Sequence, residues 1–154
     1  MRDALESMAP DGLGDLHCRV HRRGIKAWFG AATPPKAHYE AQVLPLRLAP
    51  DGEQHHSALE IGFHAEFPEE PANEAELEAL EAERHVWGPE LGPEAEAGPF
   101  LGRDSWRRLS EVWFDDDLDD PDLAFEIAGR LVDYLVVLEP ARLAATKAAH
   151  GARR

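Results

Sequence analysis

The spacing of apolar residues in the first part of the chain is that of β-strands. Leu16, Cys18 and Val20 alternate with polar neighbours, and the same alternation continues past Gly24 as far as Phe29. A period of two residues is typical of a strand with one buried face. The pattern predicts a single strand that is bulged or turned at Gly24.

Three more segments alternate in the same way and predict strands at residues 37–48, 57–67 and 105–114. In the first of them the phase of the alternation changes at Pro45. Because proline cannot donate a hydrogen bond to the neighbouring strand, this change indicates a bulge or an edge position. Neighbouring strands joined by a short connection most simply pair antiparallel.

Two segments carry the three-to-four residue spacing of apolar positions that predicts helices. The first spans residues 73–86, where Asn73 can cap the helix, and its thin apolar face indicates a surface position. The second begins near Pro121, with Asp120 as its cap, and is broken or restarted at Pro140. Its apolar stripe is wide enough to cover a sheet and consists of Ala124, Ile127, Ala128, Leu131, Val132, Leu135, Val136 and Leu138.

The remaining segments look irregular. Residues 88–99 contain three Gly-Pro pairs, which predict a long loop without regular structure. Residues 1–14 are expected to be a poorly ordered lead-in, and residues 147–154 a frayed C-terminal tail. Residues 15–146 then form a single domain, as the length of the chain suggests.

Together these elements predict an α+β domain of two layers. The expected order along the chain is β-β-β-α-β-α, with four to five strands in one antiparallel sheet. A long C-terminal helix covers one face of that sheet.

Composition and charge narrow the classes of partner. With 30 acidic against 16 basic residues, the chain has a formal net charge of −14, so its average field repels nucleic acid. One basic cluster, formed by Arg19, Arg22, Arg23 and Lys26, is read as a solvated strand edge. The single cysteine, the lack of an apolar leader and the lack of a membrane-spanning run favour a cytoplasmic protein without a membrane partner.

Polar residues at alternate positions form the first candidate site. They are His38 and Glu40 in the second predicted strand, and Glu60, His64 and Glu66 in the third. Side chains two apart on a strand point to the same side, so a His-x-Glu unit can offer two metal ligands or an acid–base pair. The alternative is that this face of the sheet is in water, where histidine and glutamate are common.

An acidic segment after the last predicted strand is a second candidate. Asp115, Asp117, Asp119 and Glu126 have the spacing of oxygen ligands in a calcium-binding loop. The match is incomplete, because Asp120 stands where such loops need glycine and a strand precedes the segment in place of a helix. The alternative is a solvated loop whose acids cap the following helix.

Trp106, Arg107, Arg108 and Trp113 form a third candidate, because tryptophan and arginine are favoured anchors of protein interfaces. Trp106 and Trp113 are an odd number of residues apart, so on a regular strand they face opposite sides of the sheet. At least one of them therefore needs burial outside the main core, by another segment or by a partner.

No phosphate-binding loop, dinucleotide fingerprint or nucleophile elbow occurs in the chain, and no cofactor is predicted. The leading hypothesis is therefore a non-enzymatic interaction or regulatory module that binds another protein, including a second copy as a homodimer. One alternative is a metal-dependent enzyme or ligand-binding domain that uses the His/Glu residues and a divalent metal. A second is an acidic mimic of nucleic acid, formed by residues 66–96 and 111–126, that binds a basic partner.

Overall fold

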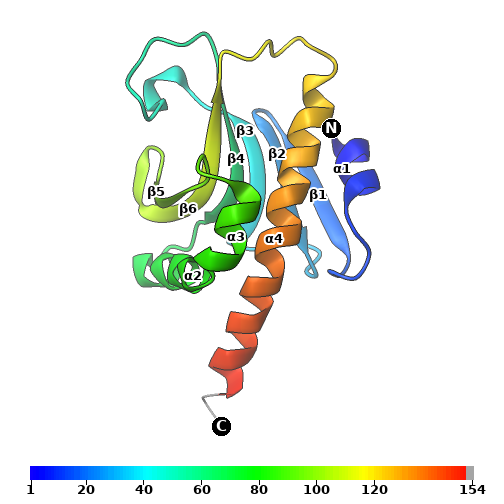
Figure 1. Ribbon diagram of the computed structural model, residues 1–154, viewed down its shortest axis with the longest axis vertical. Coiled ribbons are helices and arrows are strands. Elements are labelled where there is room, and N and C mark those ends of the chain that lie inside the picture. Colours follow the sequence, from blue (N-terminus) through cyan, green and yellow to red (C-terminus); the bar gives the residue numbers. More distant parts are fainter. Residues whose placement is uncertain (152–154) are drawn as a thin grey trace.

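The computed structural model describes the backbone of residues 1–151 and, except at 146 and 149–151, their side chains. Six strands form one antiparallel sheet in the order β1-β2-β3-β4-β6-β5 (Figure 1). The strands are β1 (Leu16–His21), β2 (Gly24–Phe29), β3 (Ala37–Val43), β4 (Ala58–Ala65), β5 (Glu96–Phe100) and β6 (Arg103–Phe114).

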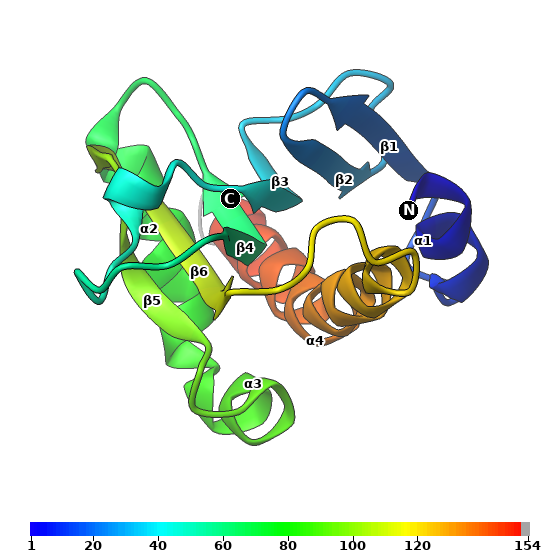
Figure 2. The ribbon, with the colours of Figure 1, turned by 90° about the horizontal axis from the view of Figure 1, so that it is seen from above.

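Within residues 1–151, four α-helices complete the α+β fold: α1 (Arg2–Met8), α2 (Glu70–Ala82), α3 (Arg84–Leu91) and α4 (Leu123–Gly151). Seen from above, α4 crosses one side of the sheet, with α1 beside it (Figure 2). The core lies between α4 and the sheet, and it includes Leu131 and Leu135 of α4 and Phe63 of β4, all fully buried. The predicted C-terminal helix over an antiparallel sheet is therefore confirmed.

The sheet has six strands, more than the four to five predicted, because two segments were misread. Residues 16–29 form a hairpin of two strands that turns at Arg22 and Arg23, in place of one bulged strand. The second segment, 88–99, is not a loop, since it contains the end of α3 and most of β5. Pro99 is tolerated there because β5 lies at the edge of the sheet.

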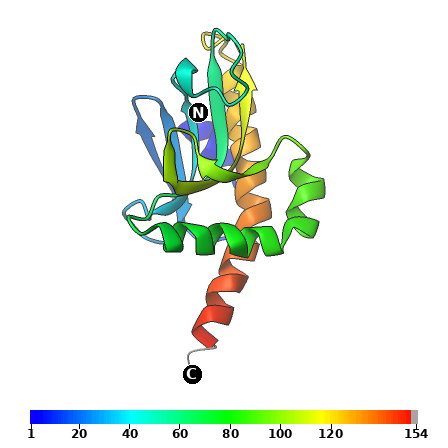
Figure 3. The same ribbon diagram turned by 90° about the vertical axis from the view of Figure 1, so that its left-hand side faces the viewer.

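The ends of the elements also differ from the prediction. Residues 2–8 of the expected lead-in form α1, whose Leu5 is fully buried in the core. Helix α4 continues through Pro140 as far as Gly151, well past the sheet (Figure 3), so only the part of the expected tail at 152–154 lies outside the described residues. Asn73 is not a cap; it lies inside α2 and bonds to the backbone of neighbouring segments.

The sheet face opposite α4 is polar, and the part around His64 is covered, whereas the part over β1 and β2 is open. Figure 1 shows the β5-β6 hairpin curving toward the connection that follows β3, and a short 3-10 helix in that connection, η1 (Leu46–Leu48), reaches the hairpin turn. Leu48 lies against the position that a side chain at Gly102 would occupy, and the Phe100 ring lies edge-on to His64, with 4.7 Å between centroids. The alternative that the part around His64 is in water is therefore wrong. None of the described helices has the length and apolar content of a membrane span.

Candidate metal centre

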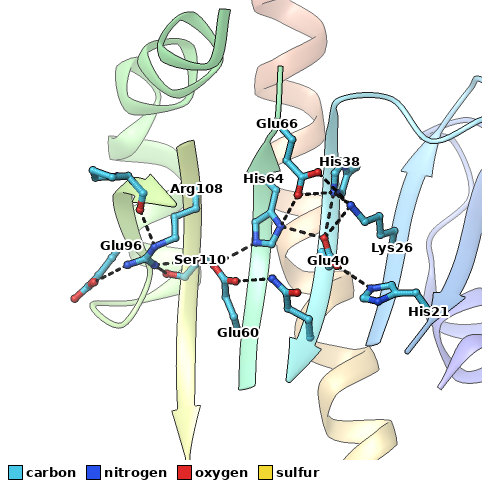
Figure 4. A network of polar contacts seen from close by, with 12 residues as sticks. His21, Lys26, His38, Glu40, Glu60, His64, Glu66, Glu96, Arg108 and Ser110 are labelled. Atoms are coloured by element: carbon cyan, nitrogen blue, oxygen red, sulfur yellow. Dashed lines mark hydrogen bonds and ion pairs between the residues drawn. The ribbon is translucent and has the colours of Figure 1, made fainter. Parts of the chain in front are cut away.

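The register of β3 and β4 brings the predicted His/Glu residues together. His38 lies directly opposite His64, and Gln42 opposite Glu60. Glu66 follows β4, and its amide donates to the Lys36 carbonyl, so its side chain stays on the same face as His64. His38, Glu40, Glu60 and His64 are at most 3% exposed. Figure 4 shows them as one network on the polar face.

Four ligand atoms in this network converge on one point. His38 Nε2 lies 3.3 Å from Glu40 Oε2 and 3.6 Å from Glu66 Oε1. His64 Nδ1 lies 3.2 Å from Glu40 Oε2 and 3.8 Å from Glu66 Oε1. Ligands about 2.1 Å from a tetrahedral ion stand about 3.4 Å from one another. These four distances are close to four of the six edges of a metal coordination tetrahedron, and all four ligand atoms lie within 4.8 Å of one another. We call His38, Glu40, His64 and Glu66 the His/Glu cluster.

Each histidine has a second ring nitrogen that faces away from the cluster, toward an oxygen acceptor. His38 Nδ1 lies 3.0 Å from the Pro35 carbonyl oxygen, which can only accept, so Nδ1 carries a proton and Nε2 is the nitrogen that faces the cluster. His64 Nε2 lies 3.2 Å from Glu60 Oε1. That contact lies off the direction of the ring N–H and leaves the buried nitrogen without an aligned hydrogen bond. His38 is therefore held by a backbone carbonyl, as histidines that bind metals usually are, while His64 has the Glu60 carboxylate close to its second nitrogen.

Glu60 is itself fixed by neighbours on both sides. Gln42 Nε2 donates to Glu60 Oε2 over 3.1 Å, and the Ser110 hydroxyl donates to Oε1 over 2.8 Å. Ser110 in turn accepts a hydrogen bond from the Arg108 guanidinium over 2.8 Å. The Ser110 hydroxyl therefore links the positive charge of Arg108 to the Glu60 carboxylate (Figure 4). The Glu60 carboxylate is therefore held in place, and its negative charge is partly balanced, without a metal ion.

Lys26 contacts the His/Glu cluster from the open side. Its Nζ lies 3.0 Å from His38 Nε2, 3.3 Å from Glu40 Oε2 and 3.2 Å from Glu66 Oε2. The Lys26 side chain is 25% exposed and that of Glu66 is 14% exposed, so the cluster reaches solvent here. An ammonium group thus lies among the groups that an ion would use.

The charges of the network are strongly coupled. Burial alone would raise the pKa of Glu40, but hydrogen bonds to His38 and His64 outweigh it and hold that pKa far below its usual range. Burial would likewise raise the pKa of Glu60, yet the charge of His64 lowers it to about 2. For His64, burial would lower the pKa, but the Glu60 and Glu40 carboxylates raise it to about 9. Without a metal, His64 is therefore protonated at neutral pH.

The four candidate calcium ligands do not come together within the part of the chain that the structure describes. Asp115 Oδ2 lies 2.8 Å from His55 Nδ1, and Asp117 Oδ1 accepts a hydrogen bond from the amide of Asp119. Glu126 lies in the first turn of α4. The contact between His55 and Asp115 instead joins the acidic segment to the connection between β3 and β4.

The residues of the Trp/Arg candidate contact other parts of the same chain. Trp106 and Trp113 face opposite sides of the sheet, as predicted, and each is half-buried. Arg107 pairs with Glu70 of α2, and Arg108 is buried in the polar network. Trp106 is covered by Phe100 of the β5-β6 hairpin, and the two rings lie edge-on to each other.

Sequence reasoning missed Lys26, His21 and the supporting role of Ser110. His21 Nε2 lies 2.7 Å from Glu40 Oε1, although not aligned for a hydrogen bond. Lys26 lies directly opposite Glu40 in the register of β2 and β3, which the alternation of residues alone does not specify.

The fold and the site describe an α+β protein with a covered His/Glu cluster on its sheet. Comparison of the chain with protein-family models, with curated proteins and with solved structures found no match. The inference of function therefore rests on the contacts of this cluster.

Proposed function

We propose that the protein binds one divalent transition-metal ion through His38, Glu40, His64 and Glu66, and acts as a metal-dependent enzyme or ligand-binding domain. The observation that carries this proposal is the convergence of two ring nitrogens and two carboxylate oxygens, all within 4.8 Å of one another. Ligands of this kind and spacing satisfy the ordinary requirements of a metal site.

The ligand types favour Zn²⁺, Mn²⁺ or Fe²⁺. Imidazole suits zinc and iron, and carboxylate suits manganese, whereas calcium and magnesium prefer sites made of oxygen alone. Four protein ligands close a tetrahedral zinc site. An ion that prefers six ligands keeps positions open at the same cluster.

A network of ion pairs alone explains the cluster less well. Glu40 and Glu60 are almost wholly removed from water, and buried carboxylates are costly unless cations pair with them. Lys26 is the nearest permanently charged cation and lies at the solvent side. In the metal-free network Lys26 and His64 pair with Glu40. His38 Nε2 and Glu66 Oε1, however, face the same place, and a metal ion would use all four groups of the His/Glu cluster.

The direct test is calorimetric titration of chelator-treated protein with Mn²⁺ and with Zn²⁺. We expect one ion per chain, and a loss of affinity of more than about 100-fold in His38→Gln, because losing a ligand costs more than losing a group that only orients one. His85→Gln is the matched control, since His85 is exposed on α3. Glu60→Gln should lose about 10- to 100-fold.

Two results would contradict the proposal. One is the absence of binding by the folded wild-type chain. The other is binding that survives His38→Gln but is lost in His55→Gln. That result would place the ion at the exposed group of Asp51, Glu53 and His55, whose ligand atoms also lie within 4.8 Å of one another.

The Trp/Arg residues nominated for an interaction module contact other parts of the same chain, and their use in an interface stays a prediction. Docking of another protein or of a second copy on a different surface stays a prediction, as does mimicry of nucleic acid.

A further inference from the structure

We propose that the metal-loaded site binds a phosphate monoester, held by Lys26 and Arg19 beside the ion. This inference rests on the proposed metal site and adds the chemical class of its ligand. It follows from the charges around the His/Glu cluster and from the side on which the cluster opens.

The charge balance changes when an ion binds. In the metal-free protein, Lys26 contacts the carboxylates of Glu40 and Glu66. A divalent ion would neutralise those two carboxylates by itself, and His38 Nε2 cannot serve both the ion and Lys26. The Lys26 ammonium then keeps only Glu66 Oε2 as a neighbour, and the ion already balances the charge of that carboxylate. Glu60 does not become a new counter-charge for Lys26, because its carboxylate faces Ser110 and Arg108 on the other side of the cluster.

A second cation stands next to Lys26. Arg19 of β1 lies directly opposite Lys26 of β2, so both side chains are on the polar face of the sheet. Arg19 is exposed and has no carboxylate partner among the described residues. Lys26 and Arg19 together carry two positive charges, which match the two negative charges of a phosphate monoester. Arginine also fits phosphate oxygens with two parallel hydrogen bonds.

The surroundings favour an anion at this place. The chain has a net charge of −14, yet Arg22, Arg23 and Lys36 are also exposed around the β1-β2 hairpin and the start of β3. Among the described residues none of these three pairs with a carboxylate. The other side of the polar face is covered by η1 and the β5-β6 hairpin. A ligand therefore reaches the cluster past the basic strands, where the local field attracts anions.

The experiment is titration of phenyl phosphate into the full chain, metal-free and loaded with Mn²⁺. We expect the loaded protein to bind phenyl phosphate at least about tenfold more tightly than the metal-free protein, since the ion balances the carboxylates that Lys26 contacts. Arg19→Ala and Lys26→Met should each weaken that binding by about tenfold or more. Arg47→Ala is the matched control, because Arg47 is exposed, in η1, and has no ion pair among the described residues. Benzoate, with one negative charge, should bind more weakly than phenyl phosphate.

The outcomes separate the two proposals. If the chain does not bind Mn²⁺, the proposed function fails and this inference fails with it. If Mn²⁺ binds but phenyl phosphate binds no better than to the metal-free chain, only the ligand inference is overturned. The same holds if Arg19→Ala behaves like Arg47→Ala, or if benzoate binds as tightly as phenyl phosphate.

Discussion

Lys26 acts as a counter-ion for two carboxylates that the sheet holds away from water. Its Nζ contacts Glu40 and Glu66 together, and both oxygens it reaches are within 3.3 Å. Without it, and without a metal, two neighbouring carboxylates would repel each other on a covered face. Lys26 is also the one member of the group on a long, partly exposed side chain, so it can leave without disturbing the strands.

Replacing Lys26 by methionine should therefore raise the affinity for a metal ion. The variant keeps the apolar stem of the side chain and removes a positive charge that competes with the ion for His38 and Glu40. We expect Mn²⁺ to bind about tenfold more tightly, a conservative value for one unit charge at this distance. Calorimetric titration of Lys26→Met and wild type measures the difference. A weaker affinity in the variant would show that Lys26 positions the carboxylates and does not compete.

At the residue level, the spacing of the chain was enough to nominate the cluster but not to establish its geometry. His64 and Glu66 share a face because they are two apart, and the same holds for His38 and Glu40. Their convergence depends on the register of β3 and β4, which pairs His38 with His64 and which spacing does not specify. Pro35 and Ser110 contribute through a carbonyl oxygen and a hydroxyl, groups too common to mark a site from sequence.

At the level of elements, Gly62 lets β6 pass close to β4 beside the site. A Cβ at Gly62 would overlap the Leu109 carbonyl oxygen and the backbone of Ser110. Ser110 is the residue that donates to Glu60, so this close approach also sets the hydrogen bond behind His64. The pairing of the two strands and the support of the cluster therefore depend on the same backbone contact.

Gly62→Ala should destabilise the fold by about 1–3 kcal/mol, because the added methyl group pushes the two strands apart. It should also weaken Mn²⁺ binding, because Ser110 moves away from Glu60. The matched control is Gly98→Ala in β5, where an added Cβ meets nothing within 4 Å. Urea unfolding and metal titration of the two variants measure both effects. Equal stability of the two variants would contradict this role of Gly62.

Among the elements, those with regular alternation or a wide apolar stripe were predicted, and those set by distant contacts were not. The β4 and α4 segments follow their own patterns. Helix α1 is held by Leu5 against α4, far away in the sequence, and so its own residues gave little sign of order. Strand β5 contains a Gly-Pro pair and forms only because β6 offers an edge to pair with.

At the scale of the whole molecule, the polar face is a charged layer under a thin cover rather than a second core. Its carboxylates and cations are balanced within the layer, from Arg108 at one end to Lys26 at the other (Figure 4). The stability of the protein must therefore depend on the charge state of this layer. A metal ion changes that charge state and so changes the dependence on pH.

Without a metal, the layer should stabilise the fold most between about pH 4.5 and 6.5. The pKa of His64 is raised from 6.5 to about 9, so the protonated ring stabilises the fold below pH 6.5, and this contribution is lost as the pH rises toward 9. The pKa of Glu60 is lowered from 4.5 to about 2, so its contribution is present above pH 4.5 and lost as the pH falls toward 2.

A bound ion should reverse the alkaline part of this dependence. The ion takes His64 Nδ1 in place of a proton, so Mn²⁺ affinity should rise by up to about tenfold per pH unit from about pH 6 to about pH 8. The increase in Tm caused by a fixed Mn²⁺ concentration should grow over the same range, because a ligand stabilises the folded state according to its affinity. Thermal unfolding with and without Mn²⁺ at each pH measures this, and His64→Gln should lose the metal-induced increase. An increase in Tm that shrinks as the pH rises would show that the proton on His64 does not compete with the ion.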